Sequence, residues 1–164
     1  MIPVIGVDLG PLTICCAVGT WNAPILLRDP AGKWELRKCG DIATACAYID
    51  DLLERRGRCV LAVEQTFSAG TKKRPWLREV GRVQESQAGY LEGVYGYTGR
   101  VEFVRVQPCI HIEGMVAWSA FGCPVLVGNT LGEHLRDALC VALKAINQRQ
   151  GHCAETPGVV SYGR

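Results

Sequence analysis

The chain has 164 residues, of which 48% are hydrophobic and 21% are charged, with a formal net charge of +2. This length and composition are those of a single soluble globular domain, and they exclude a disordered or fibrous protein. No apolar run approaches the ~20 residues of a membrane-spanning helix. The N-terminus also lacks the charged region and cleavage pattern of a secretion signal, so we expect a cytoplasmic protein. We expect one domain over residues 1–150 and a C-terminal tail over residues 151–164.

The nine cysteines raise the possibility of disulfides or a zinc site. Their number is odd, no Cys-x-x-Cys pair occurs, and most of them lie within apolar runs, as Cys15, Cys16, Cys59 and Cys140 do. This pattern is typical of buried free thiols that act as small hydrophobic residues.

The first half of the chain predicts strands followed by a helix and another strand. Residues 3–8 and 13–18 are apolar runs joined by a Gly/Pro turn, which predicts two strands. A turn at residues 29–32 indicates a hairpin that ends in a further short strand by Arg37. A helix is predicted to start at Asp41 and to end before Gly57. The apolar run 59–64 predicts the next strand.

The second half predicts a basic loop over residues 67–75, a long helix, a strand over 101–106 and further helices. The long helix carries apolar residues at helical spacing, typical of core packing, of a dimer interface, or of both: Trp76, Val80, Val83, Gln87, Leu91 and Val94. A helix over 109–121 would contain His111, which is better explained as a partly exposed residue than as a ligand. An extended piece over 125–127 and a last helix over 131–148 follow.

Two of the predicted buried strands end in a carboxylate, Asp8 in the first and Glu64 in the later one. Asp8 alone could simply cap its turn. The helix between the two strands predicts that they are parallel neighbours, which would bring both acids to one edge of the sheet. Close carboxylates repel each other unless a hard divalent cation lies between them. The sequence therefore predicts a metal site at this edge.

The last helix adds Glu133, His134 and Asp137, whose spacing lets them share a face. Glu133 is explained by the favourable position of an acid in the first turn of a helix. Asp137 lies further in, beside the apolar face, where an acid needs a partner. Together with the two strand-end acids, His134 and Asp137 would complete a divalent-cation site with mixed oxygen and imidazole ligands.

In the sequence, a cluster of basic residues follows Glu64 and precedes the last helix: Lys72, Lys73, Arg74, Arg78 and Arg82. Such a cluster alone is usually a solvated surface. Beside an acidic metal site it indicates a phosphodiester substrate, because cations hold the backbone of a nucleic acid.

The segments IGVDLG, AVEQTF and HLRDALCVAL, in this order and spacing, resemble the RuvC-type Holliday junction resolvases of the ribonuclease H-like superfamily. The resemblance extends from Ile5 to about Ala145 and suggests a divergent or phage-encoded member. It implies an α/β fold with a central five-stranded mixed sheet, three antiparallel strands followed by two parallel ones, flanked by helices. It also implies that the catalytic and metal-binding residues are Asp8, Glu64, His134 and Asp137, and that Phe67 contacts bases at the junction.

By this resemblance the chain would be a crossover junction endodeoxyribonuclease that makes paired symmetric nicks during recombination, repair or phage DNA processing. Two Mg²⁺ ions per site, or Mn²⁺ in their place, would serve the reaction, with His134 either as a ligand or as a group that handles protons. The partners would be a four-way DNA junction and a second copy of the chain. Residues 107–122 lack the basic segment usual in this family, so the basic residues of 72–82, or Arg100 and Arg105, would contact the phosphates instead.

Other functions are open on sequence grounds. A YqgF-like or ribonuclease H-like nuclease would keep the fold and act on RNA or an RNA–DNA hybrid, which differ from DNA in groove shape and 2′-hydroxyl contacts. A non-catalytic nucleic-acid-binding protein would be expected to have lost some of the acids. A sugar-kinase-like or Hsp70-like ATPase, suggested by DLGPLT, requires a second duplicated domain that 164 residues do not supply.

Overall fold

The computed structural model describes residues 2–21, 35–65, 75–107 and 130–153. Their elements are, in chain order, β1 (Ile2–Asp8), β2 (Cys15–Trp21), β3 (Glu35–Lys38), α1 (Ile42–Arg56), β4 (Cys59–Glu64), α2 (Pro75–Tyr95), β5 (Val101–Val106) and α4 (Thr130–Cys153). The strands form a five-stranded sheet in the order β3-β2-β1-β4-β5. Strands β1 to β3 pair antiparallel, whereas β4 is parallel to both β1 and β5. The predicted mixed sheet is confirmed.

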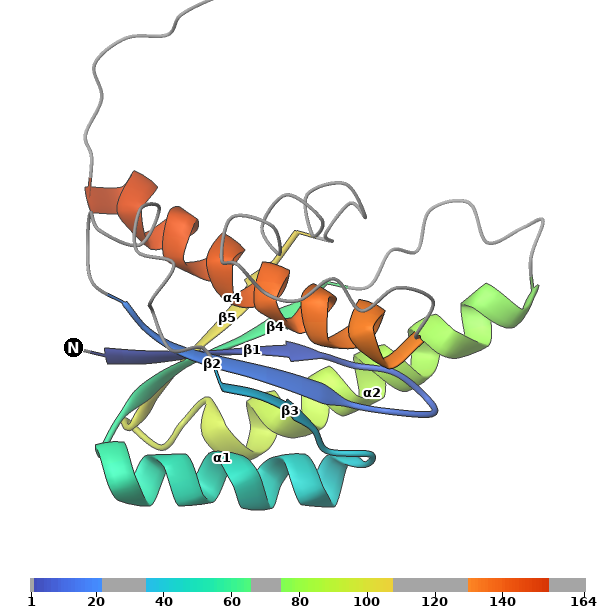
Figure 1. The fold of residues 1–164 in the computed structure, drawn as a ribbon, viewed down its shortest axis with the longest axis horizontal. Coiled ribbons are helices and arrows are strands. Elements are labelled where there is room, and N and C mark those ends of the chain that lie inside the picture. The colour runs from blue at the N-terminus through green and yellow to red at the C-terminus, as the bar shows by residue number, and fades with distance from the viewer. Residues whose placement is uncertain (1, 22–34, 66–74, 108–129, 154–164) are drawn as a thin grey trace, which may run out of the picture.

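The sheet lies between two helical layers, with α4 on one face and α1 and α2 on the other (Figure 1). Side chains of a strand alternate between the faces. In β1, Ile5 and Val7 belong to the core on the α1 and α2 side, whereas Val4 packs with residues of α4. Strand β1 is therefore covered on both faces, which explains its almost continuous apolar sequence.

Helix α1 has the ends that the sequence predicts. The Asp41 carboxylate accepts a hydrogen bond from the Thr44 amide at 2.7 Å. At the other end Gly57 adopts a φ of 80°, and its N–H donates to the Leu53 carbonyl at 2.8 Å. Arg100 supplements this end, because its guanidinium donates to the carbonyls of Gly57 and Leu53 at 2.9 and 2.5 Å.

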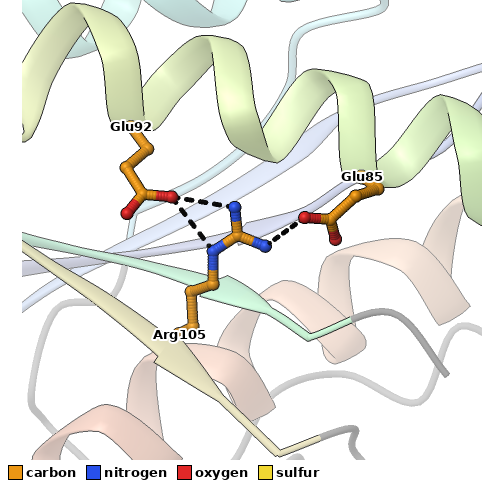
Figure 2. A network of polar contacts seen from close by, with 3 residues as sticks. All are labelled: Glu85, Glu92 and Arg105. Atoms are coloured by element: carbon orange, nitrogen blue, oxygen red, sulfur yellow. Dashed lines mark hydrogen bonds and ion pairs between the residues drawn. The ribbon is translucent and has the colours of Figure 1, made fainter.

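Strand β5 is tied to α2 by Arg105, which reaches between two glutamates of the helix (Figure 2). Its Nη1 lies 2.7 Å from Glu85 Oε1, and its Nη2 lies 2.8 Å from Glu92 Oε2. These contacts raise the pKa of Arg105, with the hydrogen bond to Glu92 as the largest cause. Arg100 and Arg105, which the sequence offered as phosphate contacts, are therefore both engaged in contacts that hold the fold together.

Other sequence predictions differ in detail from the structure. Helix α4 runs to Cys153, past the predicted end at Gln148. The predicted apolar stripe of α2 is divided, because Leu91 is fully buried whereas Trp76 and Val94 are 61% and 42% exposed. Helical periodicity does not distinguish a core face from an exposed apolar one.

The cysteine prediction is confirmed for the six cysteines whose side chains the structure describes. Cys15, Cys16, Cys39, Cys59 and Cys140 are buried free thiols, and Cys46 is half-buried. Several predictions lie outside the described residues: the turn at 29–32, residues 67–74 of the basic loop predicted over 67–75, the helix over 109–121 with His111, the extended piece over 125–127, and residues 154–164 of the tail predicted over 151–164. Pro75, the last residue of the predicted loop, instead begins α2. Within the described ranges, no helix is long and apolar enough to cross a membrane.

Candidate active site at the carboxyl ends of two parallel strands

Asp8 and Glu64 end the neighbouring parallel strands β1 and β4. The last paired residues of these strands are Val7 and Val63, so each acid follows directly after that pair. By strand alternation Asp8 lies on the same face as Val4, which packs with α4. Glu64 shares the face of Val60, which belongs to the same α4 cluster. Both acids thus stand at one edge of the sheet on the face that α4 covers.

Helix α4 can approach β1 closely because residue 6 is glycine. A Cβ atom at Gly6 would overlap the carbonyl oxygen of Ala138 and the amide nitrogen of Ala142, and it would lie 2.7 Å from the Ala142 Cβ. His134 lies one helical turn before Ala138 and therefore projects from the same face of α4. Its Nδ1 lies 2.6 Å from Oδ2 of Asp8.

The Asp8–His134 pair is electrostatically coupled. The Asp8 side chain is 8% exposed. Burial raises the pKa of Asp8, and the hydrogen bond and positive charge of His134 partly offset that rise. In turn the hydrogen bond to Asp8 is the largest cause that raises the pKa of His134, with smaller contributions from the charges of Asp137 and Glu133. The separation of 2.6 Å between Nδ1 and Oδ2 is that of a short hydrogen bond, so one proton lies between the imidazole and the carboxyl group.

Asp137 lies beside this pair, three residues further along α4. Its side chain is 34% exposed, and its Oδ1 lies 3.9 Å from Nε of Arg136. The structure thus brings Asp8 and His134 into contact, with Asp137 near enough for its charge to act on the imidazole. Glu64 joins them at the same sheet edge.

Carboxylate and imidazole groups are donors that suit Mg²⁺ or Mn²⁺, so the predicted set fits a divalent cation by its chemistry. Whether these side chains are also close enough together to bind a metal ion is a second question. Among the described residues, no group of three or more His, Cys, Asp or Glu side chains is arranged to hold a metal ion.

The predicted nucleic-acid contacts are only partly described. Arg78 and Arg82 are exposed and lie one turn apart on α2. Arg82 makes a loose ion pair with Glu79 at 3.6 Å, in which both side chains are 71% exposed. Phe67, Lys72, Lys73 and Arg74 fall outside the described residues.

The structure also shows neighbours of the site that sequence reasoning missed. Cys15 is paired with Asp8 across β1 and β2, and burial, followed by the Asp8 charge, raises the pKa of this thiol to about 11. Gln84 and Gln87 of α2 donate hydrogen bonds to the carbonyls of Leu9 and Gly10, directly after Asp8. Of these three residues, only Gln87 could have been noticed in the sequence, because it is a polar residue within an apolar helical stripe.

Solved structures of junction resolvases resemble this chain. Thermus thermophilus RuvC in complex with a Holliday junction substrate aligns with a TM-score of 0.59 and 16% identity, covering 92% of this chain and 97% of RuvC. The chain has the ribonuclease H-like fold of RuvC. The Thermus thermophilus RuvC structure gives a TM-score of 0.57 at 16% identity over 92% of this chain and 97% of that one. Fowlpox virus resolvase in complex with Holliday junction DNA gives 0.57 at 10% identity over 90% of this chain and 99% of the resolvase.

The similarity to RuvC lies in the structure. No protein-family model matches the sequence, and no curated protein matches it either. At 16% and 10% identity the likeness establishes the fold. The roles of individual residues therefore depend on the chemistry of the site.

Proposed function

We propose that the chain is a metal-dependent, structure-selective DNA endonuclease that resolves four-way junctions by paired symmetric nicks. The observation that carries this proposal is the buried Asp8 carboxylate at the end of β1, bonded to His134 of α4 at the edge where β4 ends in Glu64. A RuvC-like fold supports it, since two of the similar solved structures contain Holliday junction DNA.

The residues that would hold Mg²⁺, or Mn²⁺ in its place, at two ions per site are Asp8, Glu64, His134 and Asp137. When bound, such ions neutralise charge on the scissile phosphate and make a coordinated water more acidic. The chain itself orients the groups. His134 fixes the Asp8 carboxylate through its Nδ1 proton, and the imidazole side chain is 40% exposed, so water or a phosphate can reach it.

The phosphate backbone would be held by the basic residues at the start of α2 and in the loop before it: Lys72, Lys73, Arg74, Arg78 and Arg82. Arg78 and Arg82 are exposed, which suits this role. Phe67, three residues after Glu64, would stack on a base at the centre of the junction. Contacts to phosphates position a nucleic acid without reading its sequence, as recognition by shape requires.

Two symmetric nicks require two active sites, so we propose that the chain acts as a homodimer. The exposed apolar residues of α2 offer a surface for the second copy. Trp76, Tyr90 and Val94 are 61%, 55% and 42% exposed. Their spacing of fourteen and four residues places them on one side of the helix.

The proposal is tested by cleavage of a labelled four-way DNA junction, compared with duplex DNA, single strands, RNA–DNA hybrid and structured RNA, in Mg²⁺ and in EDTA. We expect paired nicks in the junction only, and only with metal. Asp8→Asn should lower the cleavage rate by about 10³-fold or more while junction binding in EDTA is kept, because the lost charge serves the metal. Asp51→Asn, the same chemical change at an exposed position of α1, is the matched control and should cut normally.

Other outcomes distinguish the alternatives. Cutting of the hybrid or of structured RNA would support the same active-site residues but would indicate that the substrate is RNA or an RNA–DNA hybrid. Junction binding without any cutting would favour a non-catalytic binding protein. An Asp8→Asn variant that cuts at the wild-type rate would show that the site is assigned wrongly.

A further inference from the structure

The turn that follows Asp8 is attached to α2 by two glutamine side chains. Gln84 Nε2 donates a hydrogen bond of 2.7 Å to the carbonyl of Leu9, and Gln87 Nε2 donates one of 3.1 Å to the carbonyl of Gly10. Leu9 and Gly10 are the first residues after β1 ends at Asp8, and both are buried. A buried carbonyl needs a donor. The two glutamine amides thus supply the hydrogen bonds for these carbonyls beyond the last residue of the strand.

Core packing anchors both ends of this turn, since Leu9 and Ile14 are buried and the Cys39 amide donates to the Ile14 carbonyl at 2.7 Å. Residues 9–14 belong to no strand, and β2 begins only at Cys15. Pro11 has no N–H to donate. Pro11 and Leu12 are exposed, and Leu12 is 92% exposed. The hydrogen bonds from Gln84 and Gln87 are the ones described for the carbonyls of Leu9 and Gly10, so the orientation of these two peptide groups directly after Asp8 depends on the amides of α2.

The two hydrogen bonds link the helical layers through the active-site turn. Asp8 meets His134 on the α4 face of the sheet, whereas the carbonyls after it are held from α2 on the opposite side (Figure 1). A shift or rotation of the backbone at Leu9 would also turn Asp8 at the strand end. Misplacement of a catalytic group by about 1 Å can cost about 10²-fold in rate.

We propose that Gln84 and Gln87 are positioning residues that hold the Leu9–Gly10 backbone and thereby fix the Asp8 carboxylate against His134 for cleavage. This inference rests on the proposed nuclease function. Neither glutamine is expected to touch the substrate, and each acts through the strand end. An amide does not titrate and donates at any working pH, which suits a fixed support better than a carboxylate or imidazole would.

The atoms around Gln87 indicate which variants are informative. Its Oε1 is buried and has no hydrogen-bond partner among the described residues. The amide is thus anchored mainly by its donor, the bond to Gly10. Methionine keeps the length and flexibility of glutamine but removes the donor, so Gln84→Met and Gln87→Met test the hydrogen bonds with little change in packing. Ser86→Ala, at an exposed position of the same helix, is the control.

The experiment separates rate from binding. We expect each single variant to lower the single-turnover cleavage rate at saturating protein by about 10-fold, and the double variant by about 10²-fold. Junction affinity in EDTA should stay close to wild type. The melting temperature should fall by only a few degrees, because each lost donor leaves a buried carbonyl without its hydrogen bond, and every variant should stay folded at the assay temperature. Hydrogen–deuterium exchange should rise in the peptide that covers residues 9–14, with no rise in α1. Ser86→Ala should match wild type in every measurement.

A double variant that cuts at the wild-type rate would overturn the inference. So would a rate loss that appears only together with a matching loss of junction affinity or of the folded fraction at the assay temperature, because that would be a general structural effect. Failure of the proposed function looks different, since wild-type protein itself would then cut no junction. In that case the catalytic role of the glutamines falls with it, whatever the exchange data show.

Discussion

Gly6 determines how closely α4 can lie on β1, and so whether His134 reaches Asp8. Any side chain at this position would meet the backbone of α4 at Ala138 and Ala142. Backbone cannot move aside as the end of a flexible side chain can, so the helix would have to lift from the sheet. A single missing Cβ is thus a condition for the contact between strand and helix at the site.

Gly6→Ala is expected to destabilise the protein by about 3 kcal/mol or more, because overpacking against backbone is costly. Urea unfolding followed by circular dichroism measures the change in free energy. Gly81→Ala is the control: Gly81 lies in α2 with no atom near an added Cβ, so alanine should stabilise by about 0.5–1 kcal/mol. Equal stability of the two variants would contradict the close approach of α4.

At the scale of elements, the N-cap of α1 makes a contribution to stability that depends on pH, because the capping residue is the ionisable Asp41. The hydrogen bond from the Thr44 backbone amide is the largest cause that lowers the pKa of Asp41 below 3.8. A carboxyl group whose pKa is lower in the folded state stabilises the fold above its unfolded pKa. That contribution is lost as the pH falls through the folded pKa.

Asp41→Asn should therefore weaken the acid dependence of stability. Asparagine also caps helices but carries no titrating group. Between about pH 6 and about pH 3, the variant should lose fewer degrees of melting temperature than wild type, as measured by thermal unfolding at each pH. Glu54→Gln, an exposed change on the same helix, should leave the wild-type acid dependence intact. An identical acid-side loss in Asp41→Asn and wild type would contradict the cap contribution.

The elements that the sequence predicts well are those whose ends are marked by residues within or next to the element itself. Asp41 and Gly57 mark the ends of α1, and the acids that end β1 and β4 follow apolar runs. Parallel pairing of β1 with β4 then follows from the helix between them. Half of the candidate site, the strand-end carboxylates, was therefore accessible from pattern alone.

What the sequence could not supply are the contacts between distant elements. Arg105 was a plausible phosphate ligand until the structure placed Glu85 and Glu92 of α2 around it. The link from Gln84 to Leu9 joins residues 75 positions apart, and no periodicity encodes it. The Asp8–His134 contact also depends on the absence of a side chain at residue 6, which is a tertiary condition.

At the scale of the whole molecule, α2 separates two surfaces. Leu91 packs into the core, while Trp76, Tyr90 and Val94 expose apolar surface. Grouped exposed apolar side chains mark interaction sites more often than scattered ones do. In the proposed dimer this face of each copy would meet the other, and the exposed Arg78 and Arg82 would remain available to the junction.

The variant Tyr90→Asp/Val94→Asp should therefore be monomeric where wild type is dimeric, because the dimer would bury two like charges from each copy. Sedimentation velocity at micromolar protein measures the state, and Glu54→Lys on α1 is the charge-changing control. Since both altered residues are exposed, the monomer should stay folded. Its melting temperature should match that of wild-type protein diluted until the dimer dissociates. On junctions it should leave single nicks in place of paired ones. A wild-type protein that is monomeric at every concentration would contradict the dimer, and a dimeric double variant would place the interface elsewhere.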